Sequence, residues 1–421
     1  MDAIKYIDKN KKEIYQLGDA LFKNPELGYK EFKTKEILTN CLKEKGYTIE
    51  NECFETAFSV SIGSGHPHIG LIAELDAIPT LNHPYANRND SNAAHSCGHS
   101  TQCTIMSSVM AALKQSGIKH GKVTLFFTPG EEYTDVEYRK KLIKSKKINY
   151  IGGKVNLLAS GIFDDVDMFI HAHTMGESKK YHFSLNSHLG GFVHKEITFK
   201  GKAAHASVLP HLGINALNAF TIFNTSVNAL RETFKEEDMI RIHGIIKEGG
   251  QTVNSIPERI VYECYVRSLN LEAMNEVSRK VDNAAIHSAK AIGASASIKN
   301  SPGYLPLIQD KNINEVIRKE MLKYCKPEDI YDGELSMAAG DIGDISIFKP
   351  TIQFGYTGFK GACHSKDLCI VDNNKAYIEP AKIIINTIYE LLNNKQLSNK
   401  IIKEYKPRMS KKEYLAYINQ K

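Results

Sequence analysis

The stretch "IGLIAELDAIP", residues 69–79, decides the fold class of this 421-residue chain. It opens with a short apolar run and then reaches a carboxylate, Asp76, and a proline. An apolar run of this length is typical of a strand that is buried on both faces, as in parallel sheets with helices on either side. We therefore expect a strand of a parallel sheet here, with Asp76 just beyond its carboxyl end.

Three more stretches also contain the short apolar run of a buried strand. Apolar runs at 122–128, 167–173 and 351–356 predict buried strands, and helical patterns separate them. The clearest helical pattern covers residues 100–116, where apolar residues recur on one side. Strands that alternate with helices predict an α/β fold around a mostly parallel sheet.

Residues 187–299 follow a different order. Their patterns predict strand, helix, strand, strand, helix and strand, which is the ferredoxin-like βαββαβ arrangement. We interpret them as a domain inserted into the first one, and we expect the lysine-rich end of the chain to form a solvated helix. The predicted division is 1–186 for the first part of the main domain, 187–299 for the inserted domain, 300–395 for the second part of the main domain, and 396–421 for the tail.

Composition excludes several classes of function. The net charge of +6 comes from 54 basic and 48 acidic residues that are mostly interspersed, so we expect no nucleic-acid partner. No apolar run approaches the roughly 18 residues of a membrane span, and the N-terminal segment lacks the apolar block of a signal peptide. The eight cysteines are scattered without a CxxC pair, which favours a reduced, cytoplasmic protein over a disulfide framework.

Residues able to bind metals or transfer protons follow the predicted strands. Asp76 comes after the first strand, Glu131 and Glu132 come after the second, and His173 ends the third. The motif "HSCGHS", residues 95–100, directly precedes the helix. Because the carboxyl ends of parallel strands open onto one crevice, we expect these side chains to meet there.

The motif "HSCGHS" allows two interpretations. Cys97 could be a nucleophile beside a histidine base, as in cysteine proteases. That interpretation leaves Glu131, Glu132, His173 and His364 without a role. A metal site uses them all, because thiolate, imidazole and carboxylate together suit zinc and similar divalent metals.

Several motifs in fixed order carry a family resemblance. Between about residues 15 and 395 they are "NPELGYKE", "AELDAIP", "HSCGHS", "TPGEE", "KGKAAHAS", "GGQTVNSIPE", "AAGDIGDIS" and "CHSKDL". They resemble the dinuclear metallohydrolases of the aminoacylase and glutamate-carboxypeptidase superfamily. Within it they are similar to the amidohydrolase branch, with hippurate hydrolase, indole-acetyl-amino-acid hydrolases and above all the p-aminobenzoyl-glutamate hydrolase group. Glu74 stands where the peptidase branches carry a ligand histidine, which favours the amidohydrolase branch.

The resemblance implies two divalent metals, such as zinc or manganese, and a set of ligands. By their match to the family motifs, the ligands are Cys97, His99, Glu132, His173 and His364. The same match makes Glu131 the general base. It makes Asp76 a residue that does not bind the metal itself but orients the imidazole of a ligand histidine. Ser100 stands where the family has Asp or Asn, so we expect altered hydrogen bonding around the metals without loss of metal.

The inserted domain resembles the family's lid and dimerisation domain, which implies a homodimer. His205 matches a catalytic histidine that reaches the active site of the partner subunit. Asn254 and Arg267 lie where the family binds substrate, although a plain charge at a sheet edge is an equally open interpretation of Arg267.

The predicted function is therefore hydrolysis of the amide bond of a small N-acyl amino acid or aryl-amide conjugate by a metal-activated water. One alternative is a dipeptidase or carboxypeptidase that uses the same metals. Another is a catalytically silent protein that only binds a ligand within a larger assembly. Glu131 argues against the silent protein, because a protein that only binds has no use for a base beside the metals.

Overall fold

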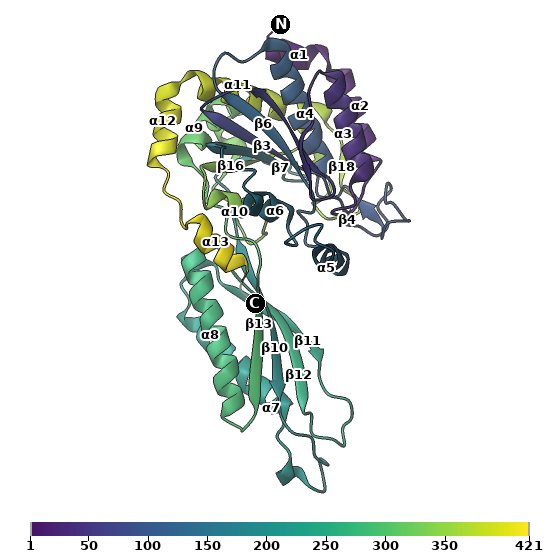
Figure 1. Cartoon of the computed structure of the whole chain (residues 1–421), viewed down its shortest axis with the longest axis vertical. Helices are drawn as coiled ribbons and strands as arrows, with labels where there is room; N and C mark the ends of the chain where they lie inside the picture. Colours follow the sequence, from purple (N-terminus) through teal and green to yellow (C-terminus); the bar gives the residue numbers. More distant parts are fainter. Residues whose placement is uncertain (1, 420–421) are drawn as a thin grey trace. The chain divides into compact units, whose positions relative to one another are not determined.

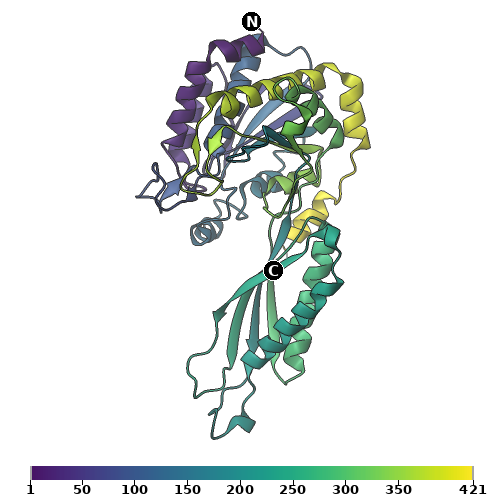
Figure 2. The same cartoon turned by 180° about the vertical axis from the view of Figure 1, so that it is seen from behind.

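The computed structural model describes residues 2–419, and these fall into two compact units (Figures 1 and 2). The first unit holds the described chain up to Ser187, then Ile308–Leu335 and Asp344–Arg408. The second unit holds His188–Leu307, Ser336–Gly343 and the described residues from Met409 onward. Residues 336–343 and 409–419 thus group with the insert by their contacts, whereas the sequence-based division places them in the main domain and the tail.

An eight-stranded mixed sheet forms the centre of the first unit. Its strands, in spatial order, are β1 (Glu50–Cys53), β2 (Ala57–Gly63), β6 (Lys122–Thr128), β3 (His68–Glu74), β7 (Met168–Thr174), β16 (Thr351–Tyr356), β8 (Phe183–Leu185) and β14 (Ile330–Asp332). The central strands β6, β3, β7 and β16 run parallel, whereas β2 and β8 join this group antiparallel on either side. The structure therefore confirms the predicted α/β fold with a mostly parallel sheet.

Helices cover this sheet, and the most buried of them begins at the "HSCGHS" motif. The helices of the first unit are α1 (Ala3–Lys9), α2 (Lys11–Phe22), α3 (Phe32–Glu44), α4 (His99–Ser116), α5 (Val136–Lys144), α6 (Gly153–Ser160), α9 (Lys311–Met321), α11 (Glu379–Asn393) and α12 (Lys395–Glu404). Helix α4 packs against β3 and contacts α1, α2 and α11, so nearly all of its residues are buried (Figure 1). No helix within residues 2–419 is both long enough and apolar enough to cross a membrane.

Short elements complete the first unit and the crossings between units. The two-stranded sheets are β4 (Ile78–Pro79) with β5 (Ala93–Ala94) and β17 (Phe359–Lys360) with β18 (Cys369–Ile370). Near the crossings lie β9 (His188–Leu189), β15 (Leu335–Ser336) and α10 (Ile342–Ser346). Some of these short elements also reach the core, since Phe359 of β17 is buried in it and Ile370 of β18 packs against it.

Strand register brings the functional segments to one edge. Glu74 at the end of β3 pairs with Thr128 at the end of β6, and His173 in β7 pairs with Gly355 in β16. The carboxyl ends of the four parallel strands therefore lie level. The loops after them emerge at the edge where parallel α/β sheets place their ligands.

The second unit has the order β10 (Gly191–Lys200), α7 (Ala216–Leu230), β11 (Arg241–Glu248), β12 (Arg259–Ser268), α8 (Leu271–Lys290) and β13 (Ser295–Pro302). Its antiparallel sheet has the spatial order β11-β12-β10-β13, and α7 and α8 pack on it and on each other. The apolar face of the sheet and the facing sides of both helices form a core of their own. This confirms the predicted βαββαβ insert.

The C-terminal segment is helical, as the sequence suggested, but it is divided into two helices and is not wholly solvated. It forms α12 and a second helix, α13 (Lys411–Ile418). Ile401 in α12 and Tyr414 in α13 are fully buried, so each helix is anchored by an apolar contact. Because lysines cover the outer faces of the two helices, these single anchors do not stand out in the sequence pattern.

Candidate metal centre

The predicted metal ligands all lie in the first unit, on segments that leave the same edge of its sheet. Glu132 follows β6, and His173 is the last residue but one of β7. Cys97 and His99 flank the start of α4, and His364 lies in the loop after β17. The structure thus gathers residues that are up to 267 positions apart in the sequence.

The "HSCGHS" turn depends on its glycine. Gly98 has a φ of +86°, and a Cβ built on it would lie 2.4 Å from a side-chain carbon of Thr174. Only glycine fits a left-handed turn at so close an approach. This turn points both Cys97 and His99 into the cluster at the start of α4.

Two of the histidines are held in the tautomer that a metal ligand needs. Nδ1 of His99 lies 2.8 Å from the carbonyl oxygen of Asp76, and Nδ1 of His173 lies 2.8 Å from the carbonyl oxygen of Thr174. A carbonyl oxygen only accepts, so each Nδ1 carries the proton. Each Nε2 therefore keeps its lone pair, which is the arrangement typical of metal-binding histidines.

The thiol of Cys97 lies at the centre of the cluster. Its Sγ is 3.4 Å from Nε2 of His173 and 3.3 Å from Nε2 of His364. Nε2 of His364 is in turn 3.0 Å from Oε1 of Glu132. A tetrahedral ion with zinc bond lengths would separate its nitrogen and sulfur ligands by about 3.5 Å. The donor atoms are therefore spaced within a few tenths of an ångström of what a divalent metal requires.

The donor atoms form three overlapping groups that could each hold an ion. These are Cys97, His99 and His173; Cys97, Glu132 and His364; and Glu74, His99 and Glu131. The first two groups contain all five predicted ligands and share the thiol, so they form one continuous cluster. Among residues 2–419, the buried atoms Nε2 of His99 and Oε1 of Glu132 have no hydrogen-bond partner. The residues thus fit a dinuclear centre.

Cys97 is poorly suited to act as a nucleophile. Burial and the nearby negative charge of Glu132 hold the pKa of its thiol well above the usual range. A catalytic cysteine needs a depressed pKa so that the thiolate is present at neutral pH. A metal ion removes this difficulty, because a coordinated thiol is deprotonated. The electrostatics therefore favour the ligand interpretation.

Asp76 lies where it can orient its neighbours. Besides the bond through its carbonyl, its Oδ1 is 3.3 Å from Nδ1 of His99 and its Oδ2 accepts a 2.9 Å hydrogen bond from the backbone N–H of Glu132. Glu131 is buried, and its Oε2 is 3.9 Å from Nε2 of His99. Ser100 is buried, and its hydroxyl has no hydrogen-bond partner among residues 2–419.

Two buried side chains fix the loop that carries the two glutamates. Arg139 of α5 donates to the carbonyl oxygens of Gly130 and Glu132, at 2.9 and 2.5 Å. Glu31 accepts from the backbone N–H of Gly130 at 2.9 Å. Burial and the charge of Asp76 raise the pKa of Glu31 to about 8. These contacts hold the loop that carries Glu131 and Glu132 in a fixed position.

Glu74 is the residue whose importance the sequence only hinted at. Its carboxylate lies 2.5 Å from Nζ of Lys154, 3.2 Å from Nε2 of His171 and 3.2 Å from Nε2 of His99. Gln102 accepts from the backbone N–H of Glu74 through Oε1 at 2.5 Å, and its Nε2 lies 2.8 Å from Nε2 of His171. The one signal for this network was the unusual glutamate at position 74. Lys154 gave none.

The three residues predicted in the insert lie in the second unit. His205 is exposed, and its Nδ1 accepts from the backbone N–H of Val208 at 3.2 Å. A bridge between His205 and Ser255 places it beside Asn254, which is also exposed. Arg267 lies apart from them, in β12.

Arg267 is not the sheet-edge charge that the sequence left open. Strand β12 lies inside the sheet, between β11 and β10. The guanidinium lies 5.2 Å from the ring centre of Phe192 and 5.3 Å from that of Tyr265. Nη1 donates to the carbonyl of Met337 at 3.0 Å, and the buried Nε has no partner among residues 2–419.

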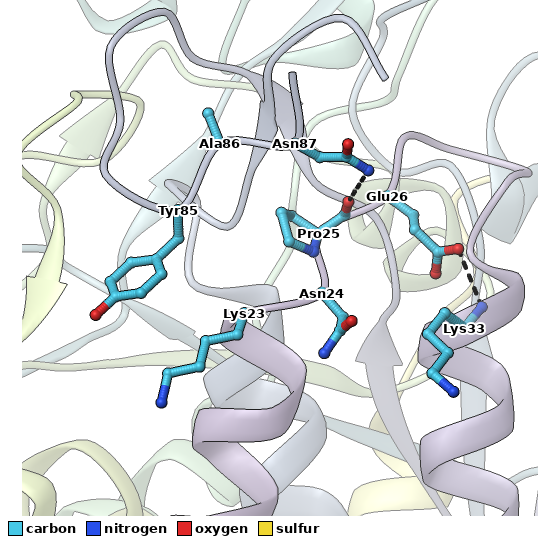
Figure 3. A pocket seen from close by; sticks show the side chains of 8 residues that line it. All are labelled: Lys23, Asn24, Pro25, Glu26, Lys33, Tyr85, Ala86 and Asn87. Carbon is cyan, nitrogen blue, oxygen red and sulfur yellow. Dashed lines mark hydrogen bonds between the residues drawn. The ribbon is translucent and has the colours of Figure 1, made fainter. Parts of the chain in front are cut away.

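A surface hollow of about 390 Å³ lies elsewhere on the first unit (Figure 3). Its lining comes from the end of α2, the start of α3 and the loop at 85–87, and includes Lys23 and Lys33 on opposite sides. Asn87 donates to the carbonyl of Pro25, and Lys33 donates through its backbone to Glu26 (Figure 3). No residue predicted for the metal centre lines this hollow.

Comparison with known proteins agrees with this geometry. A model of "Peptidase family M20/M25/M40" matches residues 70–389, so the chain belongs to this family. It is therefore a hydrolase of a peptidase family, and its clustered donor atoms are arranged as metal ligands could be.

Individual relatives are distant. The chain is 24% identical to Xaa-Arg dipeptidase from Mus musculus over 98% of its own length and 93% of that protein. It is 28% identical to a p-aminobenzoyl-glutamate hydrolase chain from Escherichia coli over 59% of its length and 50% of that protein. A dinuclear metal-binding peptidase from Bacillus subtilis, with 18% identity, superposes with a TM-score of 0.72 over 92% of this chain and 99% of that one. At this identity the superposition shows the fold alone.

Proposed function

We propose that this protein is an amidohydrolase that cleaves the amide bond of a small N-acyl amino acid or aryl-amide conjugate, similar to the p-aminobenzoyl-glutamate hydrolase group. The observation that carries the proposal is one cluster that combines the buried Cys97 with the half-buried His173 and the exposed His364, next to a second, buried carboxylate, Glu131. A metal-binding protein without catalysis needs the ligands. It has no need of that carboxylate.

In this proposal the metals are held by Cys97, His99, Glu132, His173 and His364. When bound, the two divalent ions supply the positive charge that acidifies a water and polarises a carbonyl group. Glu131 accepts a proton from the attacking water and then returns it to the nitrogen of the leaving amine. Asp76 keeps His99 in the required tautomer and holds the backbone of Glu132 in place.

Arg267 and Asn254 are proposed to bind the carboxylate of the substrate. The two aromatic rings beside Arg267 and the carbonyl of Met337 fix the guanidinium in one orientation, while Nε keeps a free N–H among the described residues. A fixed guanidinium loses little conformational entropy when it binds a carboxylate. Asn254 is exposed and offers an amide group beside His205.

A homodimer through the insert is part of the proposal, with His205 acting in the active site of the partner subunit. Strand β11 is an edge strand with Ile245 and Ile246 exposed on it. Exposed apolar edge strands are surfaces on which a second chain can pair. A reducing, cytoplasmic location is also proposed, because all eight cysteines are free thiols and Cys97 must stay one to bind metal.

Dipeptide hydrolysis is a second candidate function. It is favoured by the match to Xaa-Arg dipeptidase, which spans nearly the full length of both chains. The same metals and the same base serve both reactions, so the pocket walls decide between them. Glu74, in place of the ligand histidine of the peptidase branches, favours the amidohydrolase.

The test is metal analysis followed by a substrate panel. The purified protein should hold up to two divalent ions, and a chelator should abolish activity that added metal restores. N-acyl amino acids and aryl-amide conjugates should be cleaved faster than dipeptides. Full activity in the metal-free protein that a thiol alkylator blocks would overturn the metal mechanism. A preference for dipeptides would support the second candidate.

A further inference from the structure

Glu74 and His99 face each other at a distance that a single shared ion would suit. Nδ1 of His99 already carries its proton, because it donates to the carbonyl oxygen of Asp76 at 2.8 Å. Nε2 therefore presents a lone pair, and Oε2 of Glu74 presents another only 3.2 Å away. Two lone pairs at this distance repel each other unless a proton or a metal ion lies between them. In the metal-loaded protein, Nε2 of His99 is occupied by the metal.

The spacing suits two ligands of one ion. With bonds of about 2.0–2.2 Å from metal to nitrogen and oxygen, a separation of 3.2 Å corresponds to an angle of roughly 100° at the metal. Glu131 completes a group in which all three donor atoms lie within 4.8 Å of one another. Nε2 of His99 is buried and has no hydrogen-bond partner among residues 2–419. The group therefore contains a nitrogen atom that points into it and is available to bind a metal ion.

Lys154 makes an extra carboxylate tolerable at this position. Its ammonium is fully buried and lies 2.5 Å from Oε1 of Glu74. The ion pair engages Oε1, whereas Oε2 accepts a 3.3 Å hydrogen bond from Nε2 of Gln102 and lies 3.2 Å from Nε2 of His99. A buried carboxylate without such a partner would resist ionisation.

We propose that Glu74 is a further ligand of the metal ion that His99 holds, with Lys154 as its buried counter-charge. The inference rests on the proposed dinuclear centre and adds a ligand that the family resemblance does not supply for this branch. In this arrangement the ion that His99 holds is also coordinated by the carboxylate of Glu74, the last residue of β3.

Calorimetric metal titration of the metal-free protein tests the proposal. Zinc should bind to the wild-type chain at two positions. Glu74→Gln should weaken one of them by at least about tenfold, since even residues behind the ligands change metal affinity by 10- to 100-fold. Glu379→Gln serves as the matched control, because Glu379 is a buried carboxylate paired with His182. It should leave both affinities unchanged.

Glu74→Asp separates a ligand from a purely structural partner of Lys154. It keeps the negative charge but shortens the side chain by one methylene, so it can still pair with Lys154 while it no longer reaches the metal. Zinc affinity should fall as in Glu74→Gln, and the absorption bands of the cobalt-loaded protein should shift.

Wild-type affinities and an unchanged cobalt spectrum in Glu74→Asp would overturn the ligand role and leave the proposed function standing. If the wild-type chain itself binds no divalent metal, the proposed function fails together with the inference. Glu74→Asp also decides the question should Glu74→Gln fail to fold.

Discussion

Two adjacent carboxylates, Glu131 and Glu132, are proposed to serve different purposes, and the fixed loop that carries them holds each in its own position. Oε1 of Glu132 is 3.0 Å from Nε2 of His364, whereas Oε2 of Glu131 is 3.9 Å from Nε2 of His99. The shorter distance indicates a shared ion. The longer one leaves room for a water between the base and the cluster.

Glu131→Gln should therefore keep both metals and lower kcat by about 10²- to 10⁴-fold, which is the usual contribution of a general base. Glu132→Gln should instead reduce metal content. Metal analysis and steady-state kinetics on both variants check this division. A near-normal kcat in Glu131→Gln would contradict it.

The raised pKa of Glu31 predicts that the free energy of unfolding falls as the pH rises. Its pKa rises from 4.5 to about 8 in the folded protein because it is buried near Asp76. Between these two values the folded chain holds a proton that the unfolded chain has released, so stability falls as pH rises through this window. Gln keeps the acceptor for the N–H of Gly130 and cannot ionise.

Urea unfolding of the wild type and of Glu31→Gln between pH 5 and 8.5 measures the effect. The variant should gain stability relative to the wild type as pH rises across this range. Parallel pH profiles for the two proteins would show that Glu31 is ionised in the native state.

At the residue scale, sequence alone indicated the donor atoms but not what holds them. Cys97, His99 and Glu132 lie in local motifs whose residue types announce metal chemistry. Lys154 lies 80 positions from Glu74 on a helix where a lysine is normally solvated. Contacts between such distant residues leave no trace in a local pattern.

At the scale of elements, α5 acts as a clamp on the loop after β6. Arg139 of α5 is fully buried and donates to the carbonyls of Gly130, Glu132 and Ile151. Arg139→Met would leave these acceptors without the donor, and each buried unsatisfied group costs about 1–3 kcal/mol.

We expect Arg139→Met to lower the free energy of unfolding by at least about 3 kcal/mol. Arg88→Met is the control, because Arg88 is exposed in a surface loop and should change stability by less than about 0.5 kcal/mol. Urea denaturation compares the two variants. Equal stabilities would mean that water satisfies the carbonyls and that α5 is not a clamp.

The central strands and the βαββαβ insert could be predicted because their apolar periodicity is strong. The antiparallel partners β2 and β8 and the packing of the final helices could not. β8 is three residues long, and each of the last two helices has a fully buried anchor, Ile401 or Tyr414, among polar residues. Elements this short are stabilised by what they pack on, which depends on the rest of the fold.

At the scale of the whole molecule, the proposed active site needs more than one unit and more than one chain. The cluster belongs to the first unit, and His205 belongs to the second. The edge strand β11, with its exposed Ile245 and Ile246, is the surface on which the proposed two-fold dimer would form. If His205 serves the partner's cluster, each active site draws on both chains.

Mixing two inactive variants tests this arrangement. Glu131→Gln removes the base of one chain, and His205→Ala removes the proposed catalytic histidine of the other. When the two pair, one site combines both mutations and the other combines an intact Glu131 with an intact His205. Random pairing makes half of the dimers mixed, so about a quarter of wild-type activity should return.

His211→Ala is the matched control for His205→Ala, since His211 is an exposed histidine of the same unit and its loss should leave kcat unchanged. Native mass spectrometry establishes that mixed dimers form. If they form and no activity returns, His205 does not act across the interface. Activity that returns with the proportion of mixed dimers can come only from sites built by two chains, because each parent variant lacks one of the two groups in all of its own sites.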